Sequence, residues 1–171
     1  MYGTMRNQLF TTLAVLFACL SPPQAWAQTA LGTFGEWSAF SREDGGRVCY
    51  IGSIPQKSLG EYSRRGDVYI MVTHRPAEKS VGVVNIEAGY AYKEGSEVEV
   101  AIGGKTFRLY TAGGQAWAYR NEDAALIAAM RGGNAMTVKG TSNRGTVTTD
   151  TYSLAGFTAG YQAIGKACGV Q

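Results

Sequence analysis

The residue types that carry most enzyme chemistry are scarce in this sequence. His74 is the single histidine among 171 residues, and it lies in Thr73-His74-Arg75-Pro76. Imidazole is the side chain best matched to proton transfer at neutral pH, so His74 and Arg75 form one candidate site, that of a hydrolase whose Ser, Thr or carboxylate is brought close by folding. A strand end that enters a proline-bounded turn is more typical of a structural histidine.

Motifs for catalysis and for cofactor binding are absent. The sequence contains no His-Glu-x-x-His, no Gly-x-Ser-x-Gly, no phosphate loop and no dinucleotide fingerprint. Glu94, Glu97 and Glu99 could supply the paired carboxylates of a glycan-processing enzyme. Alternation makes Glu97 and Glu99 neighbours on one strand face, which is more typical of a solvated surface. We therefore predict no catalytic residues, no metal and no cofactor.

A threonine-rich segment offers hydrogen-bonding groups for a ligand. The β-branched, polar pattern of residues 146–152 favours a strand with its hydroxyls on one face, and Ser142-Asn143-Arg144-Gly145 before it predicts a hairpin turn. The candidate binding surface, for a glycan or a peptide, comprises Arg144, Thr146, Thr148, Asp150 and Tyr152. The alternative is that these side chains satisfy turns and neighbouring backbone groups.

Residues 1–27 have the pattern of a secretory signal peptide. Arg6 precedes an apolar run over residues 9–20, and Ala25-Trp26-Ala27 predicts cleavage after Ala27. The run is shorter than the roughly 20 residues that a membrane span requires, so we predict no span after signal removal. Lipid attachment at Cys19 is the weaker alternative, because Phe17 is too bulky for a lipoprotein cleavage box.

Two cysteines remain after the predicted signal peptide is removed, and export favours a disulfide between them. Cys49 and Cys168 are the thiols of a chain sent to an oxidising compartment, and we predict that they form a disulfide. The chain-entropy relation gives such a long loop about 4 to 5 kcal/mol of stabilisation. The alternative, a redox pair, lacks the close Cys-x-x-Cys spacing.

The rest of the chain, residues 28–171, predicts one continuous domain that positions these groups. The full sequence has 16 Lys and Arg and 13 Asp and Glu; without Arg6, 15 basic residues remain. They are scattered and not clustered, so nucleic acid is not an expected partner. Short β-rich runs bounded by turn residues predict about nine antiparallel strands: 37–40, 47–54, 68–73, 81–87, 98–102, 106–111, 116–120, 136–140 and 146–152. The expected fold is mainly β, a sandwich or barrel.

Three local elements are predicted in more detail. Val98, Val100 and Ile102 alternate with polar residues before Gly103-Gly104, which predicts a two-residue hairpin returning through 106–110. A short helix is predicted from the N-cap Asn121 to Gly132. A second is predicted over 157–167, with Cys168 following its apolar face.

Nearly the whole chain after residue 27 resembles the invasion-associated locus B (IalB) family. The resemblance rests on an ordered set of segments: Phe34-Gly35-Glu36-Trp37, Val48-Cys49-Tyr50, residues 72–76, Gly89-Tyr90, Gly95-Ser96, residues 102–104, Ala116-Trp117-Ala118, residues 140–146, residues 149–154 and Lys166-Ala167-Cys168. It implies an immunoglobulin-like β-sandwich, an alphaproteobacterial type of exported protein and no established enzymatic activity. The two short helices are predicted from the residue pattern described above.

These features favour a non-enzymatic binding protein at the cell envelope. We expect a periplasmic, secreted or surface-associated protein whose partner is a protein or glycan of the envelope or of a host surface, with host-cell interaction or virulence as the role that the resemblance implies. A hydrolase using His74 and a purely structural envelope protein are the alternatives.

Overall fold

The computed structural model describes residues 28–170, and the predicted signal segment, with Cys19, lies outside the described residues. Eleven strands form one antiparallel sheet in the order β1-β2-β3-β5-β6-β9-β8-β7-β10-β11-β4. Their bounds are β1 (Thr29–Phe34), β2 (Trp37–Glu43), β3 (Arg47–Ser53), β4 (Lys57–Leu59), β5 (Tyr69–Arg75), β6 (Ser80–Glu87), β7 (Glu97–Ile102), β8 (Lys105–Ala112), β9 (Gln115–Ala118), β10 (Ala135–Thr141) and β11 (Val147–Ser153). Two α-helices, α1 (Asp123–Gly132) and α2 (Phe157–Cys168), and the short 3₁₀ helix η1 (Pro76–Glu78) complete the described part.

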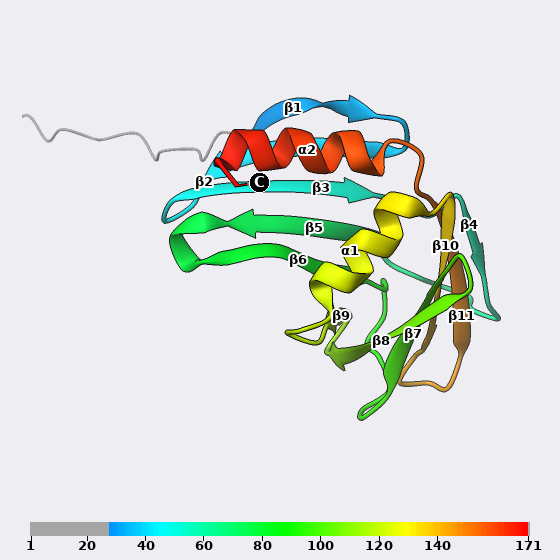
Figure 1. Ribbon diagram of the computed structural model, residues 1–171. Helices are drawn as coiled ribbons and strands as arrows, with labels where there is room; N and C mark the ends of the chain where they lie inside the picture. Colours follow the sequence, from blue (N-terminus) through cyan, green and yellow to red (C-terminus); the bar gives the residue numbers. More distant parts are fainter. Residues whose placement is uncertain (1–27, 171) are drawn as a thin grey trace, which may run out of the picture.

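The sheet is strongly bent. In Figure 1, β3, β5 and β6 run across the view, whereas β10 and β11 run nearly at right angles to them. Strand β9 pairs with β6 on one side and β8 on the other, so it joins the two halves. A sandwich is expected to have two separate sheets as its layers. Here the two layers are halves of one continuous hydrogen-bonded sheet.

The mainly β fold with two helices is confirmed, with eleven strands instead of about nine. The nine predicted strands correspond to β2, β3, β5–β9, β10 and β11. The additional strands, β1 and β4, lie at the two ends of the sheet order. Both are largely exposed and lack the alternation that buried strands show, which explains why the sequence pattern did not reveal them.

The predicted hairpin is formed by β7 and β8. Ile102 pairs with Lys105 across the turn, and Gly103 and Gly104 have φ angles of 52° and 81°. A two-residue turn of this kind requires positive φ at both positions, which glycine adopts without steric cost. Val98, Val100 and Ile102 are buried as predicted.

Helix α1 begins two residues after its predicted cap. Its N-cap is Glu122 rather than Asn121, and the cap makes no side-chain hydrogen bond. The Asp123 carboxylate instead accepts a hydrogen bond from the backbone N–H of Val84 on β6, at 2.9 Å. A tertiary contact thus fixes the start of this helix. Its apolar stripe, Leu126, Ile127 and Met130, is buried as expected from its spacing.

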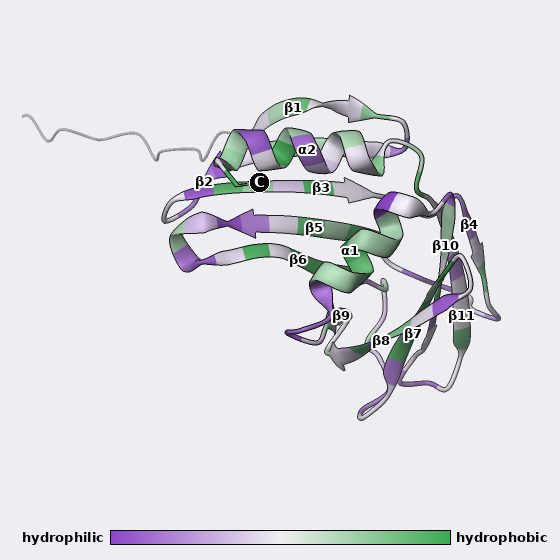
Figure 2. Ribbon diagram, viewed as in Figure 1, coloured by the Kyte–Doolittle hydropathy of each residue, from purple (hydrophilic) through white to green (hydrophobic). Residues whose placement is uncertain are grey.

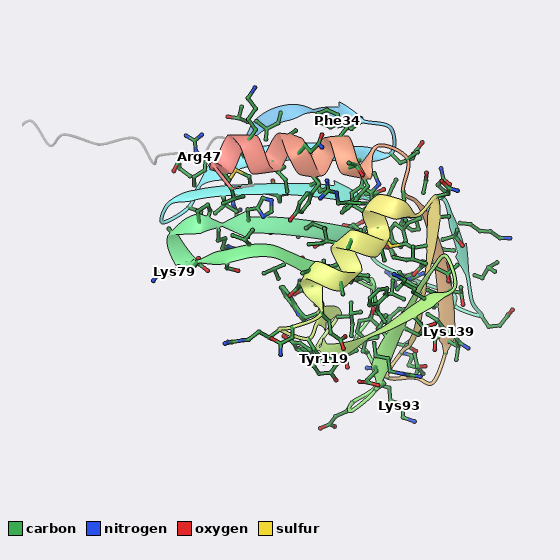
Figure 3. The ribbon with its side chains drawn as sticks, in the orientation of Figure 1. Phe34, Arg47, Lys79, Lys93, Tyr119 and Lys139 are labelled. Carbon is green, nitrogen blue, oxygen red and sulfur yellow. A yellow bond between two sulfur atoms is a disulfide. The ribbon has the colours of Figure 1, made fainter. Side chains whose placement is uncertain are left out.

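Helix α2 lies over β1, β2, β3 and β5 (Figure 1) and is covalently tied to the sheet. The predicted disulfide is confirmed: Cys168 at the end of α2 is bonded to Cys49 on β3. Phe157 and Ile164 of α2 are fully buried, and the Phe157 ring meets Trp37 edge-on with ring centroids 4.9 Å apart. The bond lies close to Arg47, labelled in Figure 3.

A continuous hydrophobic core connects both halves of the sheet with the two helices. Hydrophobic residues concentrate in the strands and on the helices, and hydrophilic residues gather at the turns (Figure 2). Neither helix of the described residues is long and apolar enough to cross a membrane.

Candidate functional site: a tyrosine–arginine cleft

The best-organised polar group of the molecule is a buried ion pair between distant segments. Arg65, in the connection from β4 to β5, donates two hydrogen bonds to the Asp150 carboxylate on β11, from Nη1 to Oδ1 at 2.7 Å and from Nη2 to Oδ2 at 2.6 Å. Its Nε–H donates to the backbone carbonyl of Ala88 at 2.7 Å. The side chains of Arg65 and Asp150 are only 5% and 3% exposed. This bidentate pair fixes the β4–β5 connection against β11.

Two tyrosine rings enclose the Arg65 guanidinium. Its central carbon lies 5.5 Å from the centre of the Tyr62 ring and 5.1 Å from that of Tyr90, distances at which a cation attracts an aromatic face. The Tyr90 hydroxyl shares a 2.6 Å hydrogen bond with the Thr148 hydroxyl on β11. Burial raises the pKa of Tyr90, although the Thr148 hydrogen bond and the charge of Arg65 act in the opposite direction. The Tyr90 phenol is therefore neutral at physiological pH.

A close backbone approach lets Arg65 reach its partners. Gly66 N–H donates to the Gly89 carbonyl at 2.9 Å, so the β4–β5 and β6–β7 connections cross here. Gly89 has a φ of +70°, and a Cβ at this position would lie 2.5 Å from the Gly66 carbonyl oxygen. Any larger residue at Gly89 would push the two segments apart and displace Arg65.

Above the ion pair lies an open cleft of about 470 Å³. We call it the tyrosine–arginine cleft; its walls are the β4–β5 connection, the β6–β7 connection and the β10–β11 turn. The residues that line it are Glu61, Tyr62, Ser63, Arg64, Gly89, Tyr90, Ala91, Ser142, Asn143, Arg144, Thr146 and Thr148. Most of these side chains are polar, so the cleft can form many hydrogen bonds with a ligand.

The β10–β11 wall is a tight, internally bonded turn. The Ser142 N–H donates a hydrogen bond to the Thr146 carbonyl at 2.8 Å, and the Ser142 hydroxyl oxygen accepts one from the Thr146 N–H at 3.1 Å. Asn143 N–H donates to the Ala91 carbonyl at 2.8 Å, which joins this wall to the β6–β7 connection. The turn that the sequence predicts over 142–145 thus holds Arg144 at the rim of the cleft.

The structure divides the predicted binding surface between the cleft and the core. Arg144, Thr146 and Thr148 line the cleft. Asp150 lies beneath it in the ion pair, and Tyr152 is fully buried. Burial raises the pKa of Tyr152. Since Thr148, Asp150 and Tyr152 share the inward face of β11, Asp150 and Tyr152 support the cleft from below and do not reach its surface.

The sequence did not point to four residues of this site: Tyr62, Arg64, Arg65 and Tyr90. The adjacent arginines follow Gly60 in an irregular segment, where no periodicity indicates orientation. Tyr90 is one of many aromatic residues in the chain, and its local sequence does not distinguish it as part of a site. What identifies the site is the contact between Arg65 and Asp150, which are 85 positions apart in the sequence. Only the folded chain brings these two residues together.

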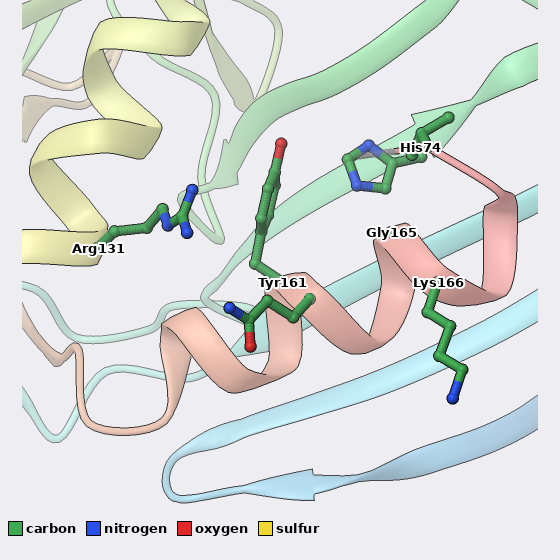
Figure 4. A pocket seen from close by; sticks show the side chains of 7 residues that line it. His74, Arg131, Tyr161, Gly165 and Lys166 are labelled. Atoms are coloured by element: carbon green, nitrogen blue, oxygen red, sulfur yellow. The ribbon is translucent and has the colours of Figure 1, made fainter.

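The predicted alternative site at His74 is a buried structural histidine. His74 is 1% exposed, and its Nδ1 accepts a 2.9 Å hydrogen bond from the Gly82 N–H. Its ring meets that of Tyr161 edge-on with centroids 5.1 Å apart, as Figure 4 shows. Burial lowers the pKa of His74 and keeps its imidazole neutral. Within residues 28–170, Nε2 has no hydrogen-bond partner, so no nucleophile or carboxylate is aligned with it.

Among the described residues that line the cavity beside His74, none is a serine, a threonine or a carboxylate. The cavity has a volume of about 370 Å³ and is lined mainly by α2 residues and by Arg131 of α1 (Figure 4). Arg75 does not line this cavity and forms a loose ion pair with Glu78 at 3.8 Å. Among the described residues, no three His, Cys, Asp or Glu side chains are grouped so that they could hold a metal ion.

The predicted glutamate pair lies on an exposed strand surface. Glu97 and Glu99 on β7 face Arg108 on β8 at 3.7 and 3.8 Å. Glu97 also accepts a hydrogen bond from the Tyr119 hydroxyl at 2.8 Å. Neither glutamate lines the tyrosine–arginine cleft.

Comparisons with known proteins agree with the resemblance seen in the sequence. Residues 37–165 match the family described as Invasion associated locus B (IalB) protein. The crystal structure of invasion associated protein b from Bartonella henselae is similar in fold, with a TM-score of 0.52 and 18% sequence identity over 80% of this chain and 96% of that chain. No curated protein matches the chain. Because the family match extends over most of its length, the chain belongs to the invasion-associated locus B family.

Proposed function

We propose that this chain is an exported, non-enzymatic binding protein of the cell envelope and that its ligand occupies the tyrosine–arginine cleft. The observation that carries the proposal is a preformed polar cleft whose walls are held by the buried pair of Arg65 and Asp150. A wall that is already ordered loses little conformational entropy when a ligand binds. The ligand is a protein or a glycan of the envelope or of a host surface.

Export is supported by covalent chemistry as well as by sequence. The disulfide between Cys49 and Cys168 belongs to the kind of bond that persists in oxidising compartments. Residues 1–27 have the composition of a signal peptide, with cleavage expected after Ala27. Together they favour a periplasmic or secreted location.

Binding rather than catalysis is supported by the composition of the cleft. Among the described residues that line it, Glu61 supplies the only carboxylate. Glycoside hydrolysis normally requires two carboxyl groups on either side of the scissile bond. The Asp150 carboxylate is occupied by Arg65, and His74 does not line the cleft. The IalB family is not a known enzyme family.

A role in host-cell interaction is part of the proposal and rests on family membership. The similar protein from Bartonella henselae is described as invasion associated. An envelope protein with a rigid polar cleft could take part in such contact by holding a surface molecule of the host.

The test is affinity capture from envelope extracts with gentle crosslinking. The purified protein, with its disulfide intact, is compared with a double variant, Arg64→Glu with Arg144→Glu, both exposed at the cleft. The control is Lys79→Glu with Lys105→Glu, which reverses two exposed charges outside the cleft. We expect wild type and control to recover the same partner and the cleft variant to lose it. Equal recovery by all three, or recovery by none, would contradict the proposal.

A further inference from the structure

The geometry points to an acidic saccharide as the ligand of the tyrosine–arginine cleft, an inference that rests on the proposed function. Arg64 lies on the β4–β5 wall of the cleft and Arg144 on the β10–β11 wall, and both are exposed. Within the described residues, neither has an ion-pair partner, whereas Arg65 is neutralised by Asp150. Glu61 is the one acidic residue of the lining, so the rim carries a net positive charge.

The arginine side chain selects for a particular kind of anion. Its planar guanidinium presents parallel N–H groups that match the two oxygens of a carboxylate or of a phosphate. Two such groups on separate walls of one cleft fit a ligand that carries more than one acidic group. Carboxylate and phosphate share this chemistry, and the experiment below separates them.

The rest of the lining matches the body of a sugar better than that of a peptide. Arg65 contacts the Tyr62 ring, and Tyr62 is still 40% exposed, so the uncovered part of the ring is available to the apolar C–H face of a pyranose. Ser63, Asn143 and Thr146 add hydroxyl and amide groups that can hydrogen-bond to sugar hydroxyls. A volume of about 470 Å³ is within the range of small-ligand sites and suits a short saccharide.

A protein partner is the less favoured occupant. The centres of protein interfaces are depleted in charge and rich in apolar anchors. This cleft is instead mostly polar, with Tyr62 and Tyr90 as its aromatic residues and Ala91 as its one aliphatic side chain. An acidic peptide is therefore used as a competing probe.

The experiment is a titration of the purified, disulfide-bonded protein followed by NMR and calorimetry. The probes are a galacturonate trisaccharide, its methyl ester, a phosphorylated disaccharide and a tetraglutamate peptide. The methyl ester keeps the size and hydroxyl groups of the acid but removes its charge. We expect the trisaccharide to shift amide signals of Tyr62, Tyr90 and Asn143 and the ester to bind at least about tenfold more weakly. Arg64→Gln and Arg144→Gln should each weaken binding about tenfold, and the control Lys105→Gln should not.

The outcomes separate this inference from the proposed function. Tighter binding of the phosphorylated sugar than of the galacturonate supports an acidic saccharide and identifies phosphate as the acidic group. Equal binding of acid and ester, binding of the peptide alone, or no binding of any probe overturns the saccharide inference. In those cases, envelope capture that still depends on Arg64 and Arg144 leaves the proposed function standing. If capture is also independent of the two arginines, the proposed function fails as well.

Discussion

Removing the charge of Asp150 while keeping its shape should destabilise the fold strongly. The substitution Asp150→Asn leaves the Arg65 guanidinium buried, with side-chain exposure of 5%, and replaces one of its two carboxylate oxygens by an NH₂ group. Loss of one partner from a buried ion pair costs about 3 to 5 kcal/mol because the other charge stays uncompensated. Asparagine retains one acceptor, so we expect about 3 kcal/mol, which corresponds to a fall in Tm of roughly 10 °C.

The assay is urea unfolding of the oxidised protein followed by tryptophan fluorescence, with linear extrapolation to water. Asp67→Asn is the matched control, because it changes an exposed carboxylate of the same connection and should alter stability by less than about 0.5 kcal/mol. A second variant adds Arg65→Met to Asp150→Asn and removes the stranded charge. It should be more stable than Asp150→Asn alone, although it also loses the hydrogen bond from Arg65 to Ala88.

Two results would refute this reasoning. If Asp150→Asn unfolds within about 1 kcal/mol of wild type, the pair does not carry an appreciable desolvation penalty. If the loss in the double variant equals the sum of the losses measured for Asp150→Asn and for Arg65→Met alone, the two side chains are not energetically coupled. Either result would also weaken the argument that the ion pair holds the walls of the tyrosine–arginine cleft.

Three further predictions concern the disulfide, the histidine and the cleft tyrosine. Cys49→Ser opens a link between residues 119 positions apart and should lower stability by about 4 to 5 kcal/mol; equal melting temperatures with and without reductant would contradict this. Because burial lowers the pKa of His74, the unfolded chain binds the extra proton, so stability should fall as pH drops below about 6.5. His74→Gln, which cannot titrate, should flatten that part of the curve of unfolding free energy against pH, and an unchanged slope would argue against it. Tyr90→Phe leaves the buried Thr148 hydroxyl without its 2.6 Å partner and should cost about 1 to 2 kcal/mol in urea unfolding, whereas Tyr110→Phe, at an exposed residue, should cost almost nothing.

Much of the secondary structure was determined by local sequence. Alternation of apolar and polar residues identifies β7, and two glycines with positive φ fix its turn into β8. The apolar spacing of α2 predicts its extent to within one residue. The predicted pairing of Cys49 with Cys168 is confirmed, and two cysteines after residue 27 allow a single pairing. The strand, turn and helix depend on residues that are neighbours along the chain, and the disulfide depends on the small number of ways in which the cysteines can pair.

The candidate site was decided by tertiary structure. Periodicity correctly indicates that Thr148, Asp150 and Tyr152 share one face of β11, but composition alone makes a face with threonine and aspartate look exposed. That face is buried because Arg65, 85 residues away, supplies the charge that makes burial of Asp150 tolerable. The start of α1 is likewise determined by a tertiary contact, because the Asp123 carboxylate accepts a hydrogen bond from the Val84 N–H of β6 instead of capping its own helix. The alternation of residues in a strand specifies which side chains share a face. Which of the two faces is buried depends on tertiary contacts, here the contact of Asp150 with Arg65, which form only in the folded protein.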